Sequence, residues 1–102
     1  MTLATMAVLR ALLDDPTAHR YGFDLAKEAG IATGSLYPIL ARLEQAGWVD
    51  SYWEEQQSGR EGRPRRRYYV LTESGAVAAR QALADALRRT TPRTRRPAEG
   101  IA

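Results

Sequence analysis

The apolar residues between positions 34 and 47 follow a helical period. Leu36, Ile39, Leu40 and Leu43 recur at intervals that place them on one face of a helix with about 3.6 residues per turn. The opposite face and its flanks carry small or hydrogen-bonding residues, namely Gly34, Ser35, Tyr37, Pro38, Ala41, Arg42 and Gln45. The pattern predicts a short helix with one buried face and one face free for contacts.

Both ends of this helix carry sequence signals. Either Thr33 or Ser35 can cap the start, and we expect Ser35 because Pro38 then lies at the third helical position, where no intrahelical N–H bond is lost. Gly47 is expected to end the helix in a left-handed conformation.

Two segments before it also predict helices. Thr2 is the expected cap of a helix over residues 3–14, whose broad apolar stripe is formed by Leu3, Met6, Ala7, Leu9, Leu12 and Leu13. A shorter helix is expected over residues 21–29, with Gly30 closing it and with Phe23, Leu25, Ala26 and Ala29 available to the core. A tight connection over residues 30–33 then predicts a helix-turn-helix.

The following segment has the composition of a β-hairpin. Residues 48–54 and 66–71 are rich in aromatic and β-branched residues, and the polar stretch between them contains glycine and proline. Four aromatic residues in it, Trp48, Trp53, Tyr68 and Tyr69, are compatible with a ligand-stacking site, but cross-strand packing is the favoured interpretation. Helix, helix-turn-helix and hairpin in this order predict a winged helix.

Thr72 precedes an alanine-rich helix predicted over residues 73–89. Its apolar surface is either a dimer seam, which we favour, or a face that folds back on the first helix. The expected dimer interface consists of Leu3, Ala76, Ala79, Leu83, Ala86 and Leu87. The sequence therefore predicts a mainly α fold with a small antiparallel hairpin, divided into a winged helix-turn-helix domain over 1–72, a dimerisation helix over 73–89 and a disordered basic tail over 90–102.

Composition excludes several classes of function. The chain has 102 residues and no cysteine, so it has neither disulfides nor thiolate metal sites, and the lone His19 is expected on a loop surface rather than in a metal site. The carboxylates Asp14, Asp15, Asp24, Glu28, Glu44 and Asp50 form no catalytic motif. Without an apolar membrane span or signal peptide, we expect a cytoplasmic, nucleoid-associated protein that is not an enzyme and uses no cofactor.

The charge is distributed unevenly along the chain. Residues 1–55 hold four Lys/Arg against eight Asp/Glu, a net charge of −4, whereas residues 56–102 hold eleven against four, a net charge of +7. The hairpin contributes the arginines Arg60, Arg63, Arg65, Arg66 and Arg67. Such a localised positive field predicts a polyanionic partner, most simply nucleic acid.

Two motifs resemble those of a known family. Leu36-Tyr37-Pro38 and Tyr68-Tyr69-x-Leu71-Thr72-x-x-Gly75, in this order and separation, closely resemble the PadR family of bacterial transcriptional regulators, and the likeness covers about residues 3–85. The resemblance implies a winged helix-turn-helix, a homodimer formed through C-terminal helices, and a pseudo-palindromic double-stranded DNA operator. It also implies a repressor released by a small-molecule effector.

The same resemblance identifies candidate DNA contacts. It places the recognition helix on Ser35, Leu36, Tyr37, Pro38 and Arg42, with Thr33 at its start, and implies a phosphate contact for Tyr21. The exposed helix face is expected to read bases through Gln45, Arg42 and Ala41, while the hairpin arginines neutralise phosphates. The alternative is a winged-helix module that binds an acidic protein partner. The single C-terminal helix lacks the aromatic residue that some members present to drugs at the dimer interface.

Overall fold

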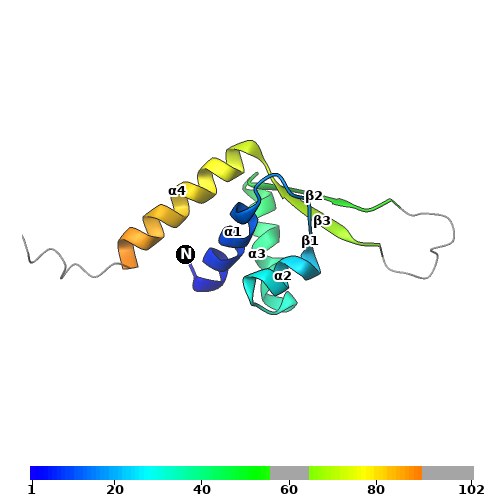
Figure 1. The fold of residues 1–102 in the computed structure, drawn as a ribbon, viewed down its shortest axis with the longest axis horizontal. Helices are drawn as coiled ribbons and strands as arrows, with labels where there is room; N and C mark the ends of the chain where they lie inside the picture. Colours follow the sequence, from blue (N-terminus) through cyan, green and yellow to red (C-terminus); the bar gives the residue numbers. More distant parts are fainter. Residues whose placement is uncertain (56–64, 91–102) are drawn as a thin grey trace, which may run out of the picture.

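The computed structural model describes residues 1–55 and 65–90, which form four helices and a small antiparallel sheet (Figure 1). In chain order the elements are α1 (Leu3–Asp14), β1 (Arg20–Tyr21), α2 (Gly22–Ala29), α3 (Thr33–Gln45), β2 (Val49–Trp53), β3 (Arg67–Leu71) and α4 (Glu73–Thr90). The sheet has the strand order β1-β3-β2. This arrangement confirms the predicted winged helix-turn-helix with an additional C-terminal helix.

The first three helices enclose the core, and the sheet and α4 complete it. Leu36 and Leu40 of α3 are fully buried, as are Leu9 and Leu25 of α1 and α2. The same cluster includes Val49, Tyr69, Leu71 and Ala79 from the sheet and α4. The predicted buried face of α3 is therefore confirmed. Figure 1 shows the β2–β3 hairpin and α4 extending from this core in opposite directions.

The start of α3 differs from the sequence prediction. Ala32 is the N-cap and no side chain caps the helix, so the expectation of Ser35 as cap, with Thr33 as the other choice, is wrong. The N–H groups of Ser35 and Leu36 both bond to the Ala32 carbonyl at 3.0 Å, which adds a turn before the expected start. Pro38 consequently lies inside the helix, and the N–H bond that it cannot donate would have reached the exposed Gly34.

Two glycines end α2 and α3 in the left-handed conformation. Gly30 and Gly47 have φ values of 72° and 79°, respectively. After each of them the chain folds back on the helix, since the N–H of Ile31 bonds to the Ala26 carbonyl at 3.1 Å and that of Trp48 to the Leu43 carbonyl at 2.9 Å. The predictions for both helix ends are confirmed.

The strand β1 was not predicted. Arg20 and Tyr21 pair with Tyr69 and Tyr68 of β3, and two residues are too few to produce a visible alternation in the sequence. The Arg20 side chain is buried, donates to the Ala11 carbonyl at 2.8 Å and forms an ion pair with Glu28.

The expectation that Phe23 belongs to the core is wrong, because its side chain is 52% exposed. It lies beside Tyr21, outside the helical core.

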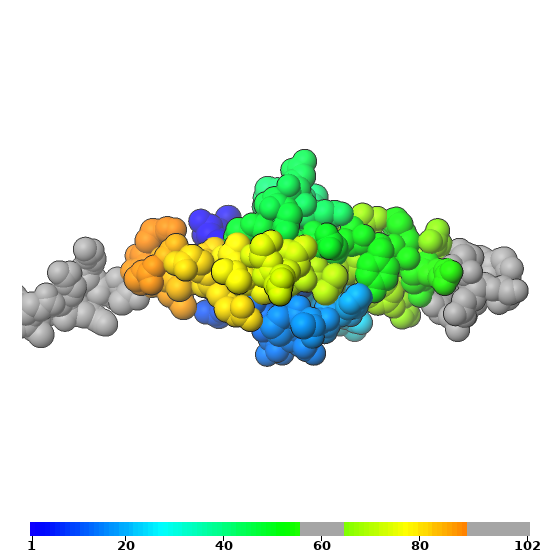
Figure 2. Space-filling view, turned by 90° about the horizontal axis from the view of Figure 1, so that it is seen from above, coloured from blue at the N-terminus to red at the C-terminus, as the bar shows by residue number. Residues whose placement is uncertain are grey.

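The start of α4 is tied to the end of α3. The hydroxyl of Thr72 accepts from the Gly75 N–H at 2.8 Å, as expected for a cap, and donates to the Gly47 carbonyl at 2.8 Å. A Cβ on Gly75 would lie 2.0 Å from the Trp48 carbonyl oxygen, so only glycine allows this approach. In the space-filling view α4 lies across the middle of the visible face, as the yellow-to-orange segment (Figure 2).

The expected dimer-interface residues differ in their exposure. Ala79 and Ala86 are covered within the single chain, which corrects the expectation that these two face a partner and supports folding back for this part of the helix. Ala76 and Leu83 are partly buried against the core. Leu3 and Leu87 are 82% and 47% exposed, as expected for a seam, and Val77 is 63% exposed.

Candidate nucleic-acid interface

The exposed face of α3 presents most of the predicted recognition residues. Ser35, Tyr37, Pro38, Ala41, Arg42 and Gln45 are all exposed. Leu36 is fully buried in the core, so its prediction as a DNA contact is wrong: the residue belongs to the face that packs against the other helices. Thr33 is half-buried at the first position of the helix. The free face is polar and small, with Arg42 as its cation.

Tyr37 lies against the start of α2. A Cβ on Gly22 would be 2.7 Å from the Tyr37 hydroxyl, so the absence of a side chain at Gly22 makes room for the phenol. On its other side the ring centroid is 6.5 Å from that of Tyr69. Burial raises the pKa of Tyr37, and the nearby Tyr21 raises it further. The phenol therefore stays neutral at physiological pH and is available as a hydrogen-bond donor.

Tyr21 and Arg66 lie at the same end of α2. Tyr21 is the N-cap of α2, and the Arg66 guanidinium carbon is 4.9 Å from the centre of its ring, a cation–π distance. A side-chain hydrogen bond with Tyr68 raises the pKa of the fully exposed Arg66. The positive end of the helix dipole adds to this charge. The N-terminus of α2 is thus surrounded by the phenols of Tyr21 and Tyr37 and by the guanidinium of Arg66. This combination is suited to phosphate oxygens.

A row of aromatic rings crosses the outer face of the sheet. Tyr21, Tyr68 and Tyr52 are partners in register on β1, β3 and β2, and the rings of Tyr52 and Tyr68 stack at 5.7 Å. The exposed His19 closes the row through an Nδ1 contact with the Tyr52 hydroxyl. The favoured interpretation, cross-strand packing, is confirmed for Tyr68, whereas Trp48 and Tyr69 pack against the core. Tyr52 was not predicted as part of this row, because its pairing with Tyr68 depends on the register of β2 and β3, which the sequence does not reveal.

The hairpin arginines occupy different environments. Arg65 is exposed and donates from Nε to the Glu54 carbonyl at 2.9 Å. The predicted contacts Arg60 and Arg63 lie outside the described residues, as does the basic tail with Arg93, Arg95 and Arg96. Arg67 is correctly placed on the hairpin, but its side chain is turned towards α3 and pairs with Glu44. Of these arginines, Arg65 and Arg66 are the described ones open to a phosphate.

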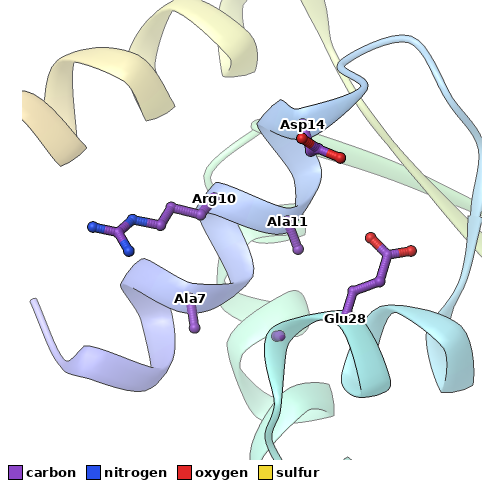
Figure 3. A pocket seen from close by; sticks show the side chains of 6 residues that line it. Ala7, Arg10, Ala11, Asp14 and Glu28 are labelled. Carbon is purple, nitrogen blue, oxygen red and sulfur yellow. The ribbon is translucent and has the colours of Figure 1, made fainter.

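A hollow lies between α1 and α2 (Figure 3). Small side chains form its walls, with Asp14 and Glu28 on facing helices and Arg10 directed away from Glu28. Arg20 already neutralises Glu28. Within residues 1–55 and 65–90, no group of His, Asp and Glu side chains is arranged to hold a metal ion, and no helix is long and apolar enough to cross a membrane.

Comparison with known families agrees with this geometry. The model of the transcriptional regulator PadR-like family matches residues 8–81, which include all of the helix-turn-helix, the hairpin and the first half of α4. The protein is a PadR-like transcriptional regulator. None of the curated protein sequences gives a significant match.

Solved structures place the PadR-like protein among winged-helix proteins. A PadR family transcriptional regulator from Eggerthella lenta is 30% identical and superposes with a TM-score of 0.59, covering 76% of this chain and 69% of that chain. A putative DNA-binding protein from Ralstonia eutropha, 24% identical, has a TM-score of 0.60 over 80% of this chain and 96% of its own. Reduced AbfR, solved bound to DNA, is 26% identical with a TM-score of 0.61 over 90% of this chain and 60% of its own.

Proposed function

We propose that this PadR-like protein is a homodimeric repressor that binds a pseudo-palindromic operator in double-stranded DNA and is released by a small-molecule effector. The observation that carries the proposal is the convergence of Tyr21, Tyr37 and Arg66 around the N-terminus of α2, next to the free face of α3. The DNA-bound structure of the similar AbfR supports DNA as the partner.

In this proposal the convergent groups bind the phosphate backbone. The phenols of Tyr21 and Tyr37 donate to phosphate oxygens, and Arg66 supplies charge together with Arg65, which lies just beyond the last paired residues of the hairpin. Each arginine that neutralises a phosphate releases a counterion, so the affinity falls with rising salt. These contacts orient the protein on DNA and contribute equally on every sequence.

Sequence discrimination belongs to the free face of α3. Arg42 has the geometry to pair with a guanine or a phosphate, Gln45 is suited to an adenine, and Ala41 is suited to contact a thymine methyl group. The side chains are exposed. A major groove about 12 Å wide admits such a helix.

Dimer formation joins two of these helices on one operator. The exposed Val77 and Leu87 of α4, together with Leu3 of α1, supply apolar surface for contact between subunits, with Leu83 at its edge. Two-fold symmetry of the dimer then requires two half-sites with a fixed separation. The effector acts by changing this separation, either as a planar apolar compound between subunits or as an anionic compound at the arginines.

Variants on α3 test the proposal. Replacing Tyr37 or Arg42 with Ala is expected to weaken binding to promoter DNA by about 1–3 kcal/mol. The Arg42→Ala variant should lose less on scrambled DNA than on promoter DNA, because base contacts exist only at the operator. Fluorescence anisotropy with labelled duplexes measures both affinities. An equal loss on both duplexes would remove Arg42 from the specificity-determining set, and binding of an acidic protein instead of DNA would support the alternative module.

A further inference from the structure

Arg67 is held by groups from three elements. Its Nη2 donates to the hydroxyl of Ser51 on β2 at 2.6 Å, and that hydroxyl donates to Oε2 of Glu44 on α3 at 2.7 Å. The guanidinium itself is 3.8 Å from Glu44 Oε2. Glu44, Ser51 and Arg67, termed here the clamp, therefore connect the recognition helix to both strands of the hairpin.

Aromatic rings hold the same guanidinium from the sheet side. The Arg67 guanidinium carbon lies 5.0 Å from the centre of the Trp53 ring and 5.9 Å from that of Tyr69. Only 33% of the Arg67 side chain is exposed. The charge of Arg67 is thus neutralised by a carboxylate and enclosed by rings, in contrast to Arg66, which is fully exposed. A phosphate at Arg67 would meet the negative charge of the nearby Glu44 carboxylate.

We propose that Arg67 is a positioning residue, which fixes the hairpin at a set angle to the recognition helix instead of contacting DNA. This inference rests on the proposed function, because the angle matters only if helix and hairpin engage one duplex together. Both surfaces can bind simultaneously only when their relative orientation matches the DNA. Fixing that orientation before binding removes the entropic cost of ordering the hairpin in the complex.

The salt dependence of DNA binding separates a positioning residue from a phosphate contact. Arg67→Met is expected to weaken promoter binding at least tenfold and to leave the slope of log K against log salt unchanged. Arg65→Ala is expected to lower the magnitude of that slope by about one. Arg10→Met removes an equal charge from the exposed side of α1 and controls for net charge. A slope that falls in Arg67→Met as it does in Arg65→Ala, or an unchanged promoter affinity, would overturn the proposal.

Glu44 provides the second arm of the test. Glu44→Ala removes the acceptor for Ser51 and should reproduce the loss seen in Arg67→Met, whereas Glu44→Gln keeps an acceptor oxygen and should recover most of the affinity. Thermal unfolding of each variant identifies any that fails to fold. Equal affinities of Glu44→Ala and the unchanged protein would contradict the clamp.

A measurement without DNA distinguishes failure of the clamp from failure of the proposed function. Because Arg67 covers the Trp53 ring, Glu44→Ala is expected to shift the Trp53 indole N–H resonance in NMR spectra, assigned with Trp53→Phe. An unshifted resonance would refute the clamp whatever the partner. If the unchanged protein shows no preference for promoter DNA but the resonance shifts, the clamp exists and the proposed function is wrong.

Discussion

Gly22 and Tyr37 are coupled through the space between α2 and α3. Replacing Gly22 with Ala places a Cβ 2.7 Å from the Tyr37 hydroxyl, which forces the phenol to move. Since the phenol is the proposed phosphate donor, we expect Gly22→Ala to weaken DNA binding by about 1 kcal/mol or more, within the usual range for one contact. Fluorescence anisotropy gives the affinity.

A double-mutant cycle tests whether this loss is transmitted through Tyr37. In a Tyr37→Ala background, Gly22→Ala should cause almost no further loss, because the phenol is already absent. Circular dichroism should show intact helices, as alanine is a good helix former. Additive losses in the cycle would mean that Gly22 serves the interface in some other way.

At the scale of elements, Gly75 controls how α4 leaves the sheet. A Cβ at this position would lie 2.0 Å from the Trp48 carbonyl oxygen, and both groups belong to backbone that cannot rotate away. We expect Gly75→Ala to lower the free energy of unfolding by about 3 kcal/mol, at the upper end of the usual cost of overpacking. Urea unfolding followed by circular dichroism measures the change.

Gly34 offers a matched control on another helix. It is exposed within α3, and a Cβ there meets nothing within 4 Å. Gly34→Ala should therefore leave stability unchanged or raise it by up to about 1 kcal/mol, through helix propensity. If Gly34→Ala lowered the free energy of unfolding as much as Gly75→Ala does, close packing of α4 on Trp48 would not be the cause of the destabilisation.

The elements that carry strong local signals could be predicted from the sequence. The cap at Thr2, the helix ends at Gly30 and Gly47 and the helical period of α3 are local features, and each is confirmed. The start of α3 could not be predicted from the preference of Pro38 for the first turn of a helix. The N–H groups of Ser35 and Leu36 bond to the Ala32 carbonyl, so the helix begins earlier and includes Pro38. The strand β1 depends on pairing with β3, nearly fifty residues away, so it leaves no local signal.

The candidate site likewise has features that could be predicted from the sequence and features that could not. The free face of α3 follows from the helical period, but that period also shows why Leu36 is unavailable to DNA. The approach of Tyr37 to Gly22 and the pairing of Arg67 with Glu44 are tertiary contacts. A run of arginines in a sequence does not reveal which of them a carboxylate neutralises.

At the scale of the whole molecule, α4 is the element that we propose for dimer formation. It extends from the core opposite the hairpin, with Leu87 47% exposed near its end (Figure 1). We expect Leu87→Asp to give monomers with much weaker operator binding, since a charge in an apolar seam is costly and two half-sites must be bridged. Sedimentation equilibrium reports the oligomeric state.

The added charge needs its own control in that experiment. Thr17→Asp introduces the same carboxylate on the exposed loop before β1 and should leave the oligomeric state unchanged. If the protein without substitutions is a monomer at micromolar concentration, the dimer proposal is refuted. A dimeric Leu87→Asp variant would exclude Leu87 from the seam.

The central claim, sequence-specific binding of DNA, is tested most directly by titrating the purified protein against DNA from its own promoter region and against scrambled DNA at two salt concentrations. We expect both affinities to fall as salt rises, and promoter DNA to remain the tighter ligand at the higher salt because base contacts do not depend on counterion release. Equal binding to both duplexes that disappears at the higher salt would contradict it.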